Sequence, residues 1–91
     1  MRLIWSPLAQ ADAVRLHRFL APKNPRAATQ AIRGLRAAAR RLLVYPQLGE
    51  LVDGIELRDV RRIFVDDYEL RYQVRGETIA VLRIWHTREN R

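Results

Sequence analysis

The sequence predicts an α+β domain in which a helical hairpin precedes an antiparallel sheet. Two helix-start signals, Ser6-Pro7 and Asn24-Pro25, lie in the first third of the chain. Beyond Pro46 the spacing of apolar residues changes from the 3.6-residue period of a helix to the two-residue period of a strand. A chain of 91 residues has the size of one domain, so we expect residues 1–91 to form a single domain.

The N-terminal segment is expected to be a short strand followed by a helix. Arg2–Trp5 is β-prone and ends at Ser6-Pro7, where serine can cap a helix and proline takes its first position. In Pro7–Leu20 apolar residues recur at three- and four-residue spacing, which predicts an amphipathic helix. Its core-facing positions are Ala9, Ala13, Leu16 and Leu20.

The second helix is the clearest element of the sequence. Asn24-Pro25 repeats the start signal, and Tyr45-Pro46 marks the end, because a proline disfavours the helical conformation of the residue before it. The apolar stripe between them is unbroken and consists of Ala28, Ile32, Leu35, Ala39 and Leu42. Few residues separate the two helices, which predicts an antiparallel hairpin.

Three strands are expected in the C-terminal half, after a loop. Leu57–Val65 is rich in β-branched and aromatic residues, and Tyr68–Arg75 alternates apolar with polar side chains. In Thr78–His86 the residues that point to either side of the strand are mostly apolar, which is the pattern of an inner strand covered on both faces. Short turns join these strands into a three-stranded antiparallel meander with the hairpin packed on one face, so the predicted order is β-α-α-β-β-β.

The composition points to a basic globular protein with an anionic partner. The net charge is +7, and all Lys and Arg residues except Lys23 are arginine, which binds phosphate and carboxylate in a bidentate way. GC-rich codon usage gives the same bias without any function. No acid lies between Asp12 and Glu50, so the helical half is expected to present a cationic surface. The chain has no cysteine and no long apolar run, which favours the cytosol over secretion or a membrane.

Short segments along the chain carry a recognisable pattern. They are Leu3-Ile4-Trp5-Ser6-Pro7 with Ala9 and Asp12, an alanine-rich helix closing on a proline after Tyr45, the Gly49 loop, Leu57-Arg58, Tyr68–Val74 and Ile84–Arg88. No single segment is specific, but their order and spacing are. On these residues the chain resembles the ParE/RelE toxins of bacterial type II toxin–antitoxin systems, closer to the ParE-like members, and this resemblance implies a RelE/ParE-like fold.

The family that the chain resembles has two branches, one inhibiting DNA gyrase (ParE-like) and one cutting mRNA on the ribosome (RelE-like). Cleavage through the 2′-hydroxyl needs a general base, a general acid and cations against the phosphorane charge. Glu69 lies where the resembling nucleases carry an arginine, and a carboxylate cannot neutralise that charge. The predicted sheet has no lysine, and no tyrosine follows His86. These departures favour the ParE-like interpretation, with the mRNA endonuclease as the alternative.

Candidate site residues follow from the two alternatives. If the chain is an endoribonuclease, His86 and Arg88 are the catalytic candidates, because histidine titrates near neutral pH and arginine can clamp a phosphate. A histidine at the end of an inner strand is also commonly a packing residue. For a binding toxin the expected target-binding residues, on one concave basic face and the tail from Trp85 to Arg91, are Arg61, Arg62, Arg71, Arg83, Trp85 and Arg88.

The resemblance also implies partners. A cognate antitoxin, small and partly disordered, is expected to fold an acidic segment along the helical hairpin and sheet, giving a hetero-oligomer. The target is DNA gyrase, or the ribosome and mRNA in the alternative, and a third possibility is an inactive domain kept as an antitoxin-bound repressor partner. No metal, cofactor or membrane is expected. The helical arginines are a solvated face or a contact for an acidic partner: Arg26, Arg33, Arg36 and Arg40.

Overall fold

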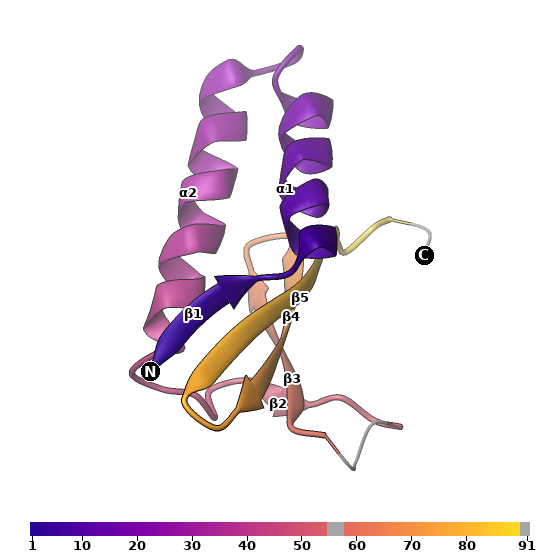
Figure 1. The fold of residues 1–91 in the computed structure, drawn as a ribbon. Helices are drawn as coiled ribbons and strands as arrows, with labels where there is room; N and C mark the ends of the chain where they lie inside the picture. The colour runs from indigo at the N-terminus through magenta and orange to yellow at the C-terminus, as the bar shows by residue number, and fades with distance from the viewer. Residues whose placement is uncertain (55–57, 90–91) are drawn as a thin grey trace.

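The computed structural model describes residues 1–54 and 58–89, and in it two helices cover one face of a sheet (Figure 1). The elements in chain order are β1 Arg2–Trp5, α1 Pro7–Leu20, α2 Pro25–Arg41, β2 Glu50–Leu51, β3 Val60–Val65, β4 Tyr68–Arg75 and β5 Thr78–His86. The α+β class and the order of strand, two helices and three long strands are therefore confirmed.

The helix starts form as the sequence predicts. The Ser6 side chain accepts a hydrogen bond from the Ala9 N–H at 3.0 Å, and the Asn24 side chain accepts one from the Ala27 N–H at 3.1 Å. Each cap satisfies one of the backbone donors that the first turn of a helix leaves open. Both helix boundaries at the N-terminal side are thus fixed by local chemistry.

The strands are arranged in the order β1-β5-β4-β3-β2. β1 pairs with β5 in parallel, and the remaining pairs, β5 with β4, β4 with β3 and β3 with β2, are antiparallel. The last three strands form the predicted meander, and β5 is the inner strand between β1 and β4. A bulge in the β4–β5 pair lies between Arg71 and Tyr72.

Two features of the segment between α2 and β4 differ from the sequence-based expectation. The loop after α2 contains the short strand β2, which is too brief for alternation to reveal. It follows Gly49, where a side chain would come within 2.6 Å of the Arg62 carbonyl oxygen, so only glycine lets the loop approach β3 this closely. β3 begins at Val60 instead of Leu57, because Arg58 and Asp59 form a turn; Leu57 itself lies outside the described residues.

The second helix ends at Arg41, four residues before the predicted end at Tyr45. The N–H groups of Leu42, Leu43 and Val44 each bond the carbonyl three residues earlier, at 3.1 Å, so the chain tightens into turns there. Leu42 is nevertheless fully buried. The apolar stripe thus continues past the helix, which is why periodicity alone overestimates its length.

The core lies between the helices and one face of the sheet. Leu16, Leu35 and Ala39 of the helices pack against strand residues that include Leu70 and Tyr72. Because successive strand residues point to opposite faces, the residues that alternate with Leu70 and Tyr72 point away from the helices. We call that side the outer face.

Candidate functional site

Three arginines stand side by side on the outer face. Arg62 of β3 is opposite Arg71 of β4, and Arg71 is opposite Arg83 of β5. Neighbouring strands lie about 4.8 Å apart and opposite residues point to the same face, so these side chains form one row across the sheet. Like charges placed opposite one another destabilise a sheet, and the row therefore needs compensating charges.

Each arginine of this row pairs with a carboxylate of the chain itself. The pairs, with their N···O distances, are Arg62–Glu50 (2.7 Å), Arg71–Glu69 (3.0 Å) and Arg83–Asp12 (2.8 Å). Glu50 comes from β2, Glu69 from β4 and Asp12 from α1. Three carboxylates thus balance three guanidinium groups, and the row is close to neutral.

Trp85 joins two arginines of the row. The Cζ atoms of Arg71 and Arg83 lie 4.9 and 5.0 Å from the centroid of its ring. Such contacts are worth about 0.5–1 kcal/mol at exposed sites and fix the direction of the guanidinium group. On β3, Phe64 is 57% exposed, with the Cζ of Arg62 5.8 Å from its ring. The outer face is therefore an arginine and aromatic surface whose side chains are already ordered.

Glu69 is buried on this face, with only 1% of its surface exposed. Its carboxylate accepts a hydrogen bond from a terminal nitrogen of Arg71. The Nε of Arg71 is also buried and has no hydrogen-bond partner in the described part of the chain. The carboxylate that departs from the nuclease pattern is thus the counter-charge of the central arginine.

Arg61 does not belong to this face. Its Nε donates to Asp59 at 2.7 Å, and its Nη1 donates to the Gly49 carbonyl at 2.9 Å. The expectation that all the C-terminal arginines surround one face is wrong for Arg61, because adjacent residues of a strand point to opposite faces. Its side chain secures the loop before β2.

His86 lies on the helix-facing side of β5, opposite Tyr68. The two rings are 5.3 Å apart and nearly perpendicular, at 89°. The His86 Nδ1 accepts a hydrogen bond from the Arg88 N–H at 3.1 Å, so the neutral ring carries its proton on Nε2. His86 and the arginine row therefore lie on opposite faces of the sheet and do not meet in one site.

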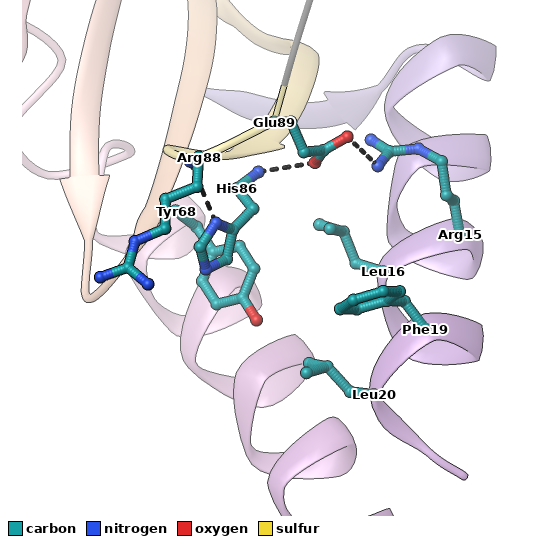
Figure 2. Close-up of a pocket in the computed structure, with 8 residues that line it drawn as sticks. All are labelled: Arg15, Leu16, Phe19, Leu20, Tyr68, His86, Arg88 and Glu89. Carbon is teal, nitrogen blue, oxygen red and sulfur yellow. Dashed lines mark hydrogen bonds and ion pairs between the residues drawn. The ribbon is translucent and has the colours of Figure 1, made fainter. Parts of the chain in front are cut away.

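A cavity of about 500 Å³ opens between His86 and α1 (Figure 2). Its lining is mainly apolar and consists of Arg15, Leu16, Phe19, Leu20, Tyr68, His86, Arg88 and Glu89. Burial, with a smaller contribution from Asp67 and Asp66, raises the pKa of Tyr68 above its ordinary value, so its hydroxyl stays protonated. The structure thus brings His86 and Arg88 together at this cavity.

Glu89 holds the segment that follows β5. Its carboxylate accepts a hydrogen bond from the His86 N–H at 2.7 Å and pairs with Arg15 of α1. Burial would raise the pKa of Glu89, but the hydrogen bonds from Arg15 and His86 outweigh it and hold the pKa below its ordinary value. Asn90 and Arg91, which the sequence places in the target-binding tail, lie outside the described residues.

Asp12 is a structural residue that sequence reasoning did not assign a role. Only 4% of it is exposed, and it accepts hydrogen bonds from two nitrogens of Arg83, the Ile84 N–H and Arg15. Burial would raise its pKa, but these donors outweigh it and lower the pKa. The available signal was its spacing, three residues after Ala9 and four before Leu16, which puts it on the buried side of α1.

Most arginines of the helical hairpin have no counter-charge within the described residues, and the turn end of the hairpin projects away from the sheet (Figure 1). None of its following arginines has an ion pair within the described residues: Arg18, Arg26, Arg33, Arg36, Arg40 and Arg41. Beside them runs a groove of about 570 Å³ between β1, α1 and α2, with Leu3, Trp5 and Val14 in its lining. The acid-free stretch of sequence thus becomes an unpaired cationic surface.

Two further observations concern metal ligands and membrane-spanning helices among the described residues. Across residues 1–54 and 58–89, no group of three or more His, Cys, Asp or Glu side chains could hold a metal ion. None of the helices in those residues is long and apolar enough to cross a membrane.

Comparison with known proteins agrees with the fold. The family model described as "ParE toxin of type II toxin-antitoxin system, parDE" matches residues 3–91. Among solved structures, the "Chromosomal ParDE TA system from P. aeruginosa" matches with a TM-score of 0.79 over 94% of this chain and 95% of that chain. At 22% identity this likeness concerns the fold alone. The search of curated proteins gives no significant match.

Proposed function

Because the chain belongs to the ParE toxin family of type II toxin–antitoxin systems, we propose that it inhibits DNA gyrase by stoichiometric binding. A cognate antitoxin neutralises it, and both act in the bacterial cytoplasm. The observation that carries this proposal is the family match over residues 3–91, on a fold whose outer face holds arginine and tryptophan side chains in fixed positions.

The outer face is the proposed target-binding surface. Tryptophan and arginine dominate the energetics of protein interfaces, and side chains that are ordered beforehand lose less entropy on binding. Trp85 with Arg71 and Arg83 meets both conditions, and Phe64 adds an exposed apolar contact. Arg62 belongs to the same row.

Two observations support binding over RNA cleavage. A nuclease site needs its acid or base and its phosphate clamps on the same side of the scissile bond. His86 instead faces α1, while the row Arg62, Arg71 and Arg83 faces away from the helices. The row is also neutralised by Glu50, Glu69 and Asp12, which weakens it as a phosphate clamp.

The antitoxin partner is proposed to approach the helical hairpin. The unpaired arginines of α2 attract an acidic segment over a distance of about 10 Å at ordinary salt concentration. The neighbouring groove with Leu3, Trp5 and Val14 offers apolar area for such a segment to cover. A flexible chain that folds on binding can use both features at once.

Two reactions test the proposal side by side. Purified toxin is titrated into a DNA gyrase supercoiling reaction and into a translating ribosome with a defined mRNA. We expect supercoiling to stop near one toxin per gyrase subunit, with the message intact, and the antitoxin to restore supercoiling. Cleaved message with normal supercoiling would establish the endonuclease instead.

Variants locate the working surface. Trp85→Ala and Arg71→Gln change the outer face, whereas Arg75→Gln changes an exposed arginine at the end of β4 and serves as the matched control. We expect the first two variants to lose inhibition and the control to keep it. Equal inhibition by all three would move the target-binding surface elsewhere.

A further inference from the structure

A line of arginines runs along the exposed side of α2. Arg33, Arg36 and Arg40 are three and four residues apart, and Arg26 precedes Arg33 by two turns, so the four side chains share one side of the helix. All four residues are exposed. At a rise of about 1.5 Å per residue the line is about 21 Å long. We call these four residues the α2 stripe.

No carboxylate compensates the α2 stripe. Within residues 1–54 and 58–89, none of its arginines takes part in an ion pair. Like charges three or four residues apart destabilise a helix. On the outer face, by contrast, every arginine of the row has its own carboxylate. The guanidinium groups of the stripe are therefore available to an anionic ligand.

The stripe continues onto α1 through a shared depression. Arg18 and His17 of α1 and Arg36 of α2 line this depression, which has a volume of about 340 Å³. Its other lining residues are apolar, so no acid lies among them. Guanidinium groups bind phosphate through charge-assisted, bidentate hydrogen bonds. Two arginines and a histidine from two helices thus form a position suited to a phosphate group.

The surroundings of the stripe favour a nucleic acid over a polypeptide. None of the exposed large apolar residues in the described part of the chain belongs to α2. The apolar side chains of the neighbouring groove, Leu3, Trp5 and Val14, come from β1 and α1. A polypeptide that folds on binding must bury apolar area to offset the entropy of ordering. A phosphate backbone needs only cations and hydrogen-bond donors, which the stripe provides.

We propose that the α2 stripe, together with Arg18, binds the phosphate backbone of duplex DNA without regard to sequence. The choice of DNA over RNA rests on the proposed function, because gyrase acts on DNA. Duplex DNA carries one negative charge per about 1.7 Å of its axis, so a line of about 21 Å meets phosphates along its whole length. The outer face points away from the helices, so gyrase and DNA can be bound at the same time.

The salt dependence of binding tests the proposal. Purified full-length toxin is titrated into a fluorescent duplex of about 20 base pairs, and the anisotropy is measured at several salt concentrations. Five arginines that each neutralise one phosphate predict a slope of about −4.5 for log K against log salt. The affinity should thus fall about 500-fold between 0.05 and 0.2 M salt. A second duplex of unrelated sequence should bind equally, and no binding at 0.05 M salt would refute the proposal.

A matched pair of variants locates the binding surface. The double variant Arg33→Gln, Arg40→Gln should flatten the slope to about −2.7, because two phosphate contacts are lost. The control Arg2→Gln, Arg75→Gln lowers the net charge by the same amount at exposed positions of β1 and β4 and should keep the natural slope. Circular dichroism checks that both variants fold. Equal flattening in the two variants would mean that net charge acts without a defined surface, and would overturn the assignment.

Two competitors distinguish the possible ligands. Duplex RNA of the same sequence should bind no more tightly than the DNA, and tighter binding would reassign the stripe to RNA. Polyglutamate, an acidic chain without apolar side chains, should displace the DNA only weakly at equal charge. Full displacement would make an acidic polypeptide the ligand. Because these measurements contain no gyrase, DNA binding can fail while gyrase inhibition stands, and the reverse outcome is equally visible.

Discussion

The outer face of the sheet and the helical hairpin are both rich in arginine, but the arginine row of the outer face is paired with carboxylates, whereas most arginines of the hairpin are not. On the sheet, Arg62, Arg71 and Arg83 each have a carboxylate within 3.0 Å. On α2, Arg26, Arg33 and Arg40 have no ion pair in the part of the chain that the structure describes. The net charge of +7 is therefore concentrated on one region of the molecule.

Because their arginines differ in pairing, the hairpin and the outer face are suited to different steps of binding. Unpaired charges act over a Debye length and raise association rates, an effect that salt removes. Paired and stacked arginines act at contact distance, where they set the dissociation rate and the specificity. The hairpin is thus suited to attracting a partner and the outer face to holding one.

The largest expected effect is at Asp12, which joins the two regions by binding Arg83 and Ile84 of β5 from α1. Asp12→Ala leaves the Ile84 N–H and the Arg83 guanidinium without their acceptor, so we expect the free energy of unfolding to fall by about 2–4 kcal/mol. Urea denaturation measures it. Asp53→Ala, at an exposed aspartate, is the matched control; equal stability of the two variants would contradict the role of Asp12.

The same carboxylate predicts a dependence of stability on pH. The pKa of Asp12 is lower in the folded protein than its ordinary value of 3.8, so its stabilising contribution is complete above about pH 4. It is lost as the pH falls through the folded-state pKa, because the protonated group no longer attracts Arg83. Urea titrations between pH 3 and pH 7 should show a smaller decline for Asp12→Asn than for the natural sequence.

On the outer face, Trp85→Ala removes the ring on which Arg71 and Arg83 stack. We expect the affinity for the target to fall about 30-fold, or about 2 kcal/mol, mainly through faster dissociation. Surface plasmon resonance with immobilised gyrase measures both rates. A slower association with unchanged dissociation would mean that this face attracts the target and does not hold it.

On the hairpin, the triple variant Arg26→Gln, Arg33→Gln, Arg40→Gln removes three exposed charges that have no ion pair within the described residues. We expect antitoxin association at low salt to slow about 10-fold and the difference from the natural sequence to vanish at 0.5 M salt. Stopped-flow kinetics at several salt concentrations gives this dependence. Unchanged association at low salt would end the distinction between the two regions.

The smallest effect concerns Gly34 in α2. A Cβ atom at this position meets no atom within 4 Å, so Gly34→Ala should stabilise the protein by about 0.5–1 kcal/mol without changing either surface. Gly76, with a φ of +54°, is the opposite control, because a side chain there is strained and Gly76→Ala should destabilise. Thermal unfolding should show a higher melting temperature for Gly34→Ala and a lower one for Gly76→Ala than for the natural sequence.

The features that the sequence predicted depend on neighbouring residues. Ser6-Pro7 and Asn24-Pro25 start the helices because caps act within three residues. Alternation in β4 put Glu69 and Arg71 on one face, where they form an ion pair. The absence of acidic residues between Asp12 and Glu50 predicted a cationic hairpin, because no carboxylate nearby in the sequence could neutralise its arginines.

The remaining features required the folded chain. Asp12 and Arg83 are 71 residues apart in sequence, and the residues that line the cavity beside His86 come from α1, from β4 and β5 and from the segment after β5. Composition and periodicity therefore determined the elements, their order and the sign of the charge. Only the tertiary structure decided which arginines are paired and which face holds His86, because ion pairing and strand register depend on distances between segments that the sequence does not specify.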